Sequence, residues 1–254
     1  AYNNMGLIFW KEGRPDLAAK YYSQAIQRKP RNADAWNNLG VVFDEQGKLD
    51  MAKDCYVRAV RIAPRFAEAW SNLGIVFGQK REYEQAVRCF RKSLQYRPDR
   101  AEFFGNLGMA QAALRRYPEA VRSYESALKR NPGLSGVRTR LGLLLEKQER
   151  WEEAETHYRA LLRGGDDPYV SLRLGVVLMR RGEFEESLRH FDRAFLLNPA
   201  LADARAHLNV GTVLMELARD EEAEEHLREA LRMRPRLKEA RDRLRAIRSQ
   251  RKKE

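Results

Sequence analysis

A 34-residue period runs through this sequence and constrains its fold more than any other feature. The stretch from Trp36 to Phe43 carries Trp, Leu, Gly and Phe at spacings of three, one and three residues. The stretch from Trp70 to Phe77 repeats this pattern 34 residues later. When each unit is numbered so that its Trp stands at position 4, the complete units begin at Ala33, Ala67, Ala101, Ser135, Pro168 and Ala204. An earlier unit lacks its first two residues, so the chain holds about seven units.

The pattern within each unit predicts two packed helices. Positions 4, 7, 8 and 11 fall within about 100° of one another on a helical wheel and form one buried stripe. Position 8 is Gly in every unit, although Gly inside a helix costs about 1 kcal/mol relative to Ala. Position 20 is Ala or Ser throughout. We therefore expect a second helix to approach the first closely where these two small residues meet.

The ends of the units predict hairpins that stack. Position 32 is Pro in six units, and Pro cannot continue a helix. One hairpin cannot cover its own apolar face, so neighbouring hairpins must cover each other. The predicted repeats are residues 1–32, 33–66, 67–100, 101–134, 135–167, 168–203 and 204–237. Residues 238–254 form a predicted C-terminal capping helix and basic tail, after an array that spans 1–237.

These residues resemble the tetratricopeptide repeat (TPR) family over nearly the whole chain. The resemblance implies an all-α fold, a right-handed α-α superhelix of about seven helical hairpins plus the capping helix. It also implies a concave surface that binds other proteins. Two places depart from the period: Arg163 to Pro168 replaces the expected Pro, and the sixth unit gains two residues near Leu201. These departures indicate either a hinge or harmless drift in a turn.

Composition limits the class of protein. The formal net charge is +12, which favours acidic partners or anionic surfaces. No apolar run approaches the roughly 20 residues of a spanning helix. The only cysteines are Cys55 and Cys89, without a CxxC motif, so a disulfide framework or a cysteine zinc site is not expected. No signal-type stretch opens the chain, which favours the cytoplasm, although a leader or a longer parent could precede Ala1.

Position 6 of the repeats predicts a ligand-binding row on the concave surface. Its residues, in order, are Asn4, Asn38, Asn72, Asn106, Arg140, Arg173 and Asn209. An Asn amide both donates and accepts hydrogen bonds, so a row of them can follow a peptide backbone of any sequence. The row resembles the asparagine ladder in the repeat region of O-linked N-acetylglucosamine transferases. Asn is also common at this position in ordinary repeats of the family.

A possible anion-binding site lies where the row changes to Arg. Arg140 and Arg173 present guanidinium groups that match carboxylates or phosphates. The other bases predicted near them are Lys147, Arg180 and Arg205. Glu146 and Glu216 could instead pair with these bases and neutralise them. If the anion site forms, replacing Arg140 and Arg173 by Glu should weaken binding and leave the array folded.

Position 9 predicts an apolar strip beside the row. It includes Val41, Ile75, Met109 and Leu143. Such a strip would suit a peptide with hydrophobic anchors, or it could pack against the neighbouring first helix. The first half of the chain also places Asp34 at position 2, and Glu residues follow there in the next two units. Cochaperone members of the tetratricopeptide-repeat family bind a partner's carboxylates with a clamp that requires Asn at position 9. This chain has no Asn at position 9, so that type of receptor is disfavoured.

Residues that resemble catalytic or metal-binding groups are interpreted as structural. Both cysteines and three histidines, His157, His190 and His226, share position 23 of different repeats. Equivalent atoms of successive repeats lie on the order of 10 Å apart, too far for a zinc site. His207 replaces the Trp of position 4. No catalytic residue, metal ligand or cofactor site is predicted.

The sequence thus favours a non-enzymatic scaffold that binds an extended or helical segment of a partner protein. One alternative is the substrate-recognition arm of a larger enzyme, such as a glycosyltransferase. A second alternative is a nucleic-acid-binding helical repeat, which the sequence pI of about 9.8 motivates. Nucleic acid is disfavoured as a partner because the predicted concave surface has mixed charge and few aromatic residues.

Overall fold

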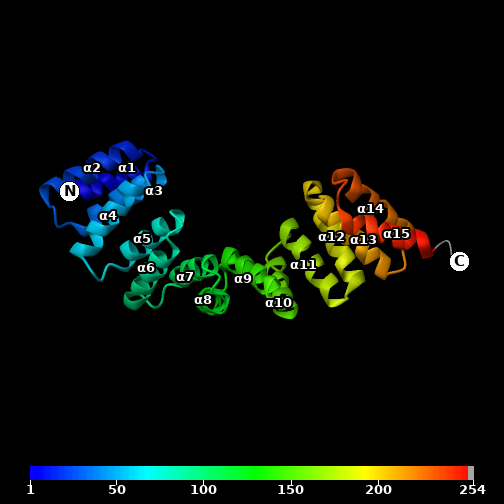
Figure 1. The fold of residues 1–254 in the computed structure, drawn as a ribbon. Coiled ribbons are helices and arrows are strands. Elements are labelled where there is room, and N and C mark those ends of the chain that lie inside the picture. Colours follow the sequence, from blue (N-terminus) through cyan, green and yellow to red (C-terminus); the bar gives the residue numbers. More distant parts are fainter. Residues whose placement is uncertain (251–254) are drawn as a thin grey trace. The chain divides into compact units, whose positions relative to one another are not determined.

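A computed structural model describes residues 1–250, and in that range the chain is all-helical, with seven helical hairpins followed by a single helix (Figure 1). The hairpins are α1 (Tyr2–Lys11) with α2 (Pro15–Arg28), α3 (Ala33–Glu45) with α4 (Leu49–Ile62), α5 (Ala67–Gln79) with α6 (Tyr83–Tyr96), α7 (Ala101–Ala113) with α8 (Tyr117–Arg130), α9 (Ser135–Lys147) with α10 (Trp151–Leu162), α11 (Pro168–Arg181) with α12 (Phe184–Leu197), and α13 (Ala204–Glu216) with α14 (Asp220–Met233). The last helix is α15 (Lys238–Gln250), and a short 3₁₀-helix η1 (Pro199–Leu201) precedes α13. The all-α class predicted from the repeats is confirmed.

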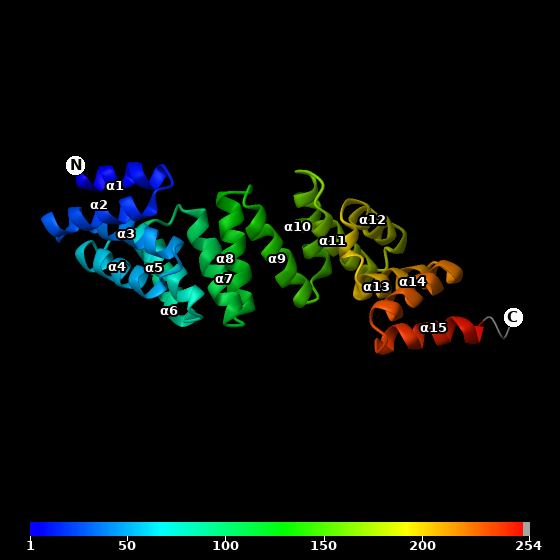
Figure 2. The same ribbon diagram turned by 90° about the horizontal axis from the view of Figure 1, so that it is seen from above.

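The chain divides into two compact units. Unit 1 spans Ala1–Leu134 and holds α1 to α8, and unit 2 begins at Ser135 and holds α9 to α15. In both units the two helices of a hairpin lie side by side (Figure 2). In unit 1 the first helices of successive hairpins also touch, α1 with α3, α3 with α5, and α5 with α7. The first helices of unit 1 therefore form one continuous row.

Local chemistry explains where the helices begin and end. From the second hairpin onward, every first helix begins at the residue where the sequence period starts a unit. Each first helix is followed by a residue with positive φ at position 15. This residue is Gly in three hairpins, but it is Arg81, Arg115, Glu149 or Ala218 in the others. The tight turn is thus imposed by hairpin packing even where the side chain disfavours that conformation.

The two departures from the period lie in turns. Asp167 caps α11, and its carboxylate accepts a hydrogen bond from the backbone N–H of Val170 at 3.0 Å. Asn198 caps η1 in the same way, with 3.1 Å to the N–H of Ala200. The short 3₁₀-helix η1 lies at the place where the sixth unit gains its two residues. Both capping side chains replace backbone hydrogen bonds that the interrupted helices lack.

The core of each hairpin is built on the repeated Gly. In the first six hairpins, a Cβ added to this Gly would meet the aromatic ring at position 24 of the second helix. At Gly74 it would lie 2.7 Å from the Phe90 ring, and at Gly40 it would lie 2.7 Å from the Tyr56 ring. The predicted close approach of the second helix to this Gly is confirmed, but the nearest group is the side chain at position 24. The backbone oxygen of position 20 is also close in the last two hairpins, at 3.2 Å for Ser187 and 3.3 Å for Ala223.

The C-terminal helix covers the apolar side of the last hairpin. Leu237, Ala240, Leu244 and Ile247 are all buried in the core of unit 2, and Ala240 and Ile247 have no exposed surface. The end of the predicted basic tail, residues 251–254, lies outside the described residues. Over the described part of the chain, no helix combines the length and apolar character needed to cross a membrane.

Two glycines of α5 provide a matched test of this packing. Gly74→Ala should destabilise the chain by about 1–3 kcal/mol, because the new methyl group overlaps the Phe90 ring. Gly78→Ala should be neutral or stabilising by less than about 1 kcal/mol, since its Cβ would meet nothing within 4 Å. Urea unfolding followed by circular dichroism measures both. Equal effects of the two substitutions would contradict the ring-on-glycine packing.

Candidate functional site

The first helices of unit 1 form a surface whose ionisable side chains are almost all acidic. Helices α3, α5 and α7 contain no Lys or Arg in their sequences, although the chain as a whole is strongly basic. Their five acids are Asp34, Asp44, Glu45, Glu68 and Glu102. Arg97 and Arg100, from the turn before α7, pair with Glu68 and Glu102 at 3.4 Å and 3.3 Å. We call the exposed side of α3, α5 and α7 the first-helix surface of unit 1.

The predicted Asn row is partly used inside the fold. The Nδ2 of Asn72 donates to Oδ1 of Asn37 at 3.0 Å, and the Nδ2 of Asn38 donates to Oδ1 of Asn3 at 3.3 Å. Each bond joins position 6 of one repeat to position 5 of the preceding repeat. The sequence analysis missed this role of position 5. Asn38 and Asn72 therefore spend one donor each on holding neighbouring first helices together.

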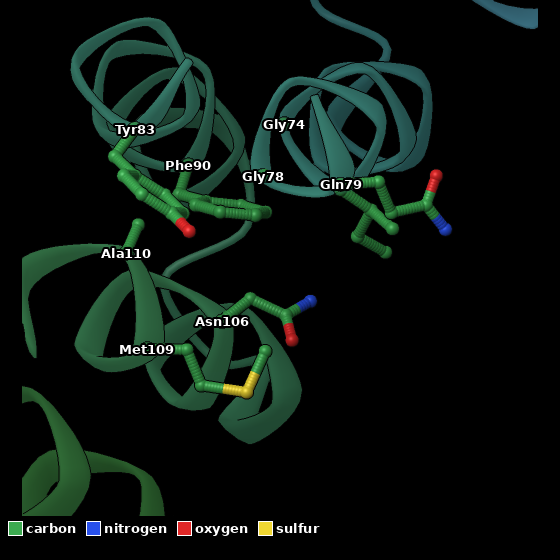
Figure 3. A pocket seen from close by; sticks show the side chains of 9 residues that line it. Gly74, Gly78, Gln79, Tyr83, Phe90, Asn106, Met109 and Ala110 are labelled. Atoms are coloured by element: carbon green, nitrogen blue, oxygen red, sulfur yellow. The ribbon is translucent and has the colours of Figure 1, made fainter. Parts of the chain in front are cut away.

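Asn106 differs from these two residues. The preceding repeat has Ser71 at position 5 in place of Asn, and Ser71 is buried. Among the described residues, the Asn106 amide has no side-chain hydrogen-bond partner in the fold, and it faces the opening of a pocket (Figure 3). The amide of Asn106 is therefore available to a ligand to a greater degree than those of Asn38 and Asn72.

The pocket beside Asn106 is a small apolar hollow between α5, α6 and α7. It has a volume of ≈ 280 Å³ and is bounded by Ile75, Phe90 and Met109, with the Tyr83 ring beside Phe90 (Figure 3). Position 12 of this repeat is Gly78, which places no side chain between the helices here. Other repeats carry Trp10, Met179 or Met215 at position 12. Part of the predicted apolar strip thus lines a cavity.

An acidic group borders this pocket on the side of α3. Gln79 lines the pocket and also hydrogen-bonds to the carboxyl of Asp44. Burial raises the pKa of Asp44, and the neighbouring Glu45 adds to this effect, while the bond from Gln79 opposes it. The Oδ1 atom of Asp44 is buried without a hydrogen-bond partner among the described residues. A positive charge arriving here would stabilise the carboxylate.

In unit 2, one of the two predicted anion-binding arginines has a partner within the fold. Arg173 donates from Nε to Glu146 at 2.9 Å and makes a second bond to the same carboxylate through its terminal nitrogen. The hydroxyl of Tyr158 also donates to the Glu146 carboxylate, and Glu146 is only 7% exposed. Reversal of Arg173 to Glu is therefore expected to destabilise the chain, since Glu146 would lose its counter-charge and face a second carboxylate.

Arg173 and Arg140 should consequently differ in their effect on stability. Arg173→Met should cost roughly 3 kcal/mol, because it leaves a buried carboxylate without its positive partner. Arg140→Met should change stability by less than about 0.5 kcal/mol, because Arg140 is exposed and has no ion pair among the described residues. Urea midpoints of the two variants measure the difference. Equal midpoints would show that the Glu146 contact contributes little.

A second hollow, of ≈ 370 Å³, gathers three of the predicted binding residues in unit 2. Arg180, Arg205 and Asn209 line it, together with Glu216 and with Glu239 and Arg243 from α15. Arg205 pairs with Glu239 at 3.4 Å, so its charge is partly compensated. Arg140, Arg173 and Lys147 do not line this hollow. The sequence analysis missed Glu239 and Arg243 because it assigned the last helix only to capping.

The histidines and cysteines behave mainly as packed residues, with one addition. Burial raises the pKa of the Cys55 and Cys89 thiols to about 12, which keeps them protonated at neutral pH. The Nδ1 atoms of His207 and His226 lie 3.0 Å apart within one hairpin. These residues stand at positions 4 and 23 of the same repeat, so a comparison of equivalent positions between repeats does not predict the pair. Among the described residues, no three His, Cys, Asp or Glu side chains are placed to hold a metal ion.

The histidine pair should make stability depend on pH. Burial lowers the pKa of both imidazoles, and for His226 the neighbouring His207 lowers it further. The unfolded chain then binds more protons below the ordinary histidine pKa of about 6.5, so stability should fall from about pH 7.5 to about pH 5.5. Urea midpoints across this range should fall less steeply for His226→Gln than for the unchanged chain. An unaltered slope in the variant would contradict a role for the pair.

The repeated hairpins and their open first-helix surface are those of a tetratricopeptide-repeat protein. The family model of the tetratricopeptide repeat itself matches residues 1–32. The family model described as "Cilia and flagella-associated protein 70 C-terminal domain" matches residues 32–248, which is most of the chain. The chain belongs to this tetratricopeptide-repeat family. Among curated proteins, none matches the sequence significantly.

Solved structures show the same fold at low sequence identity. PilF of Pseudomonas aeruginosa is 24% identical, with a TM-score of 0.65, and the match covers 84% of this chain and 98% of PilF. A tetratricopeptide repeat protein from Parabacteroides merdae is 18% identical, with a TM-score of 0.64 and 97% of both chains covered. The protein MamA is 21% identical, with a TM-score of 0.59, over 63% of this chain and 93% of MamA. At such identities these neighbours show the fold alone.

Proposed function

We propose that this chain is a non-enzymatic scaffold that binds a peptide segment of a partner protein on the first-helix surface of unit 1. The observation that supports this function most directly is the combination of the free Asn106 amide with the apolar pocket beside it. Apolar hollows with a few convergent polar groups are the usual form of a binding site. Membership of the tetratricopeptide-repeat family supports the same conclusion, since its members generally mediate protein interactions.

The chemistry of the surface suits a peptide ligand. Asn106 and Gln79 each carry a carboxamide at the pocket, and each can both donate to and accept from a peptide unit. The pocket volume of ≈ 280 Å³ is below the range of about 300–1,000 Å³ typical of small-molecule sites. It holds one side chain more readily than a cofactor. The surface also lacks Lys and Arg in α3, α5 and α7, which disfavours nucleic acid as the ligand here.

A random peptide library displayed on phage, selected against the intact chain, tests this function. The selected peptides should bind about tenfold more weakly to a chain with Asn106→Ala and Gln79→Ala, because two hydrogen-bonding amides are lost. The matched control is Gln27→Ala with Gln95→Ala, which removes two exposed amides from second helices. Equal losses in the two variants, or failure to select any peptide, would contradict the proposal.

A further inference from the structure

The apolar lining of the pocket in unit 1 and the acids near it indicate what kind of ligand side chains would bind there. We propose that it receives one bulky apolar side chain from an extended partner segment that also carries Lys or Arg next to that anchor. This inference rests on the proposed function and specifies its ligand. The anchor would enter beside Gly78, and the basic residue would lie toward Asp44 on α3.

The shape of the pocket supports a single apolar anchor. The pocket is lined by the Phe90 ring and by Ile75, Met109 and Ala110. Asn106 and Tyr83 also line it, while the carboxamide of Gln79 points away from the Phe90 ring (Figure 3). Met109 is 40% exposed in spite of its apolar side chain, and Met adapts readily to ligands of different shape. An apolar side chain placed here would remove this surface from water, while its backbone could reach the Asn106 amide.

The electrostatics on either side of the pocket support a basic neighbour. Asp44 and Glu45 are adjacent acids at the end of α3, and the Glu45 carboxylate already accepts a bond from Nε1 of Trp10 at 2.9 Å. Among the described residues, Asp44 has no such cationic or hydrogen-donating partner at its buried Oδ1. No basic residue of α3, α5 or α7 is available to compensate it. A ligand with Lys or Arg would supply a charge that complements this edge.

Gly78 leaves this pocket without a side chain at position 12, whereas the hollow at the same positions of the sixth and seventh repeats is bounded by Met179. Every other repeat has a side chain at position 12, including Asp44 in the second repeat and Ala112 in the fourth. Gly78 has a helical conformation and open space around its missing Cβ. A larger residue there would fill the pocket without forcing the helices apart. Gly78→Leu is therefore a direct way to block the proposed anchor site.

The test uses peptides from the library selection and four variants of the intact chain. The consensus should contain a bulky aliphatic or aromatic residue with Lys or Arg close to it. Replacing that residue by Ala in a synthetic peptide should weaken binding by about tenfold to a hundredfold. Gly78→Leu should cause a similar loss, whereas Gly78→Ala should retain binding. The helical spectrum of each variant shows whether it has remained folded.

The charge part of the inference has its own comparison. Peptides with Lys beside the anchor should bind several-fold more tightly than peptides with Glu there, and added salt should reduce this preference. Asp44→Asn should reduce the preference too. Asp34→Asn removes the same charge from the other end of α3, roughly 15 Å away along the helix, and should leave the preference nearly unchanged.

The possible failures can be told apart. If no peptide binds, the proposed function and this inference both fail. If peptides bind through Asn106 and Gln79 but lack an apolar anchor, tolerate Gly78→Leu or prefer Glu to Lys, the scaffold function stands and the inference is wrong. The anchor is also tested by replacing the bulky residue of the peptide with Ala. The inference can therefore be tested even if the Gly78→Leu variant unfolds.

Discussion

Contact between a first-helix glycine and a ring of the second helix underlies the rest of this structure. In six hairpins a Cβ on the glycine would lie about 2.6–3.1 Å from an aromatic ring, and in the last hairpin Leu227 takes the place of the ring. This close approach fixes the buried side of every first helix. Positions on the opposite side are left for solvent, for the neighbouring first helix or for a ligand. The same contact, repeated, makes each hairpin similar enough in shape to stack on the next, as expected for a solenoid whose repeats mainly contact their neighbours.

The two units use the outer sides of their first helices differently. Unit 1 leaves an acidic surface with an apolar pocket on its first helices, whereas in unit 2 Arg173 of α11 pairs with buried Glu146 of α9. On the second helix α10, Arg159 pairs with Glu155 at 2.6 Å. Glu155 also binds Arg181. Buried carboxylates need such partners, because an unpaired charge in the interior is costly. These three arginines of unit 2 are therefore committed to its own fold, although pairing with acids leaves the formal net charge of +12 unchanged.

The Asn row shows how identical residues acquire different roles. Asn38, Asn72 and Asn106 occupy the same position of successive repeats, and helical geometry places them on the same side of their helices. Their partners depend on the preceding repeat, which offers an Asn to the first two and the buried Ser71 to the third. The third amide is thus left at the edge of a pocket that Gly78 also lines. A binding site arises where two small departures from the repeat coincide.

The sequence by itself determined the all-helical fold of paired helices, because this follows from a period that recurs in every repeat and needs only local geometry. The predicted buried stripe was only partly right, since Trp36 and Phe43 are half-buried whereas Ala35 and Val42 are fully buried. The sequence also identified position 6 as a row. Only the tertiary structure decided which members of that row are free, that Arg173 is held by Glu146 and Tyr158, and that His207 meets His226. These contacts join residues 12 to 35 positions apart, with side-chain conformations that no helical wheel specifies. The pocket is of the same kind, since a cavity is defined by side chains that are absent as well as by those that surround it.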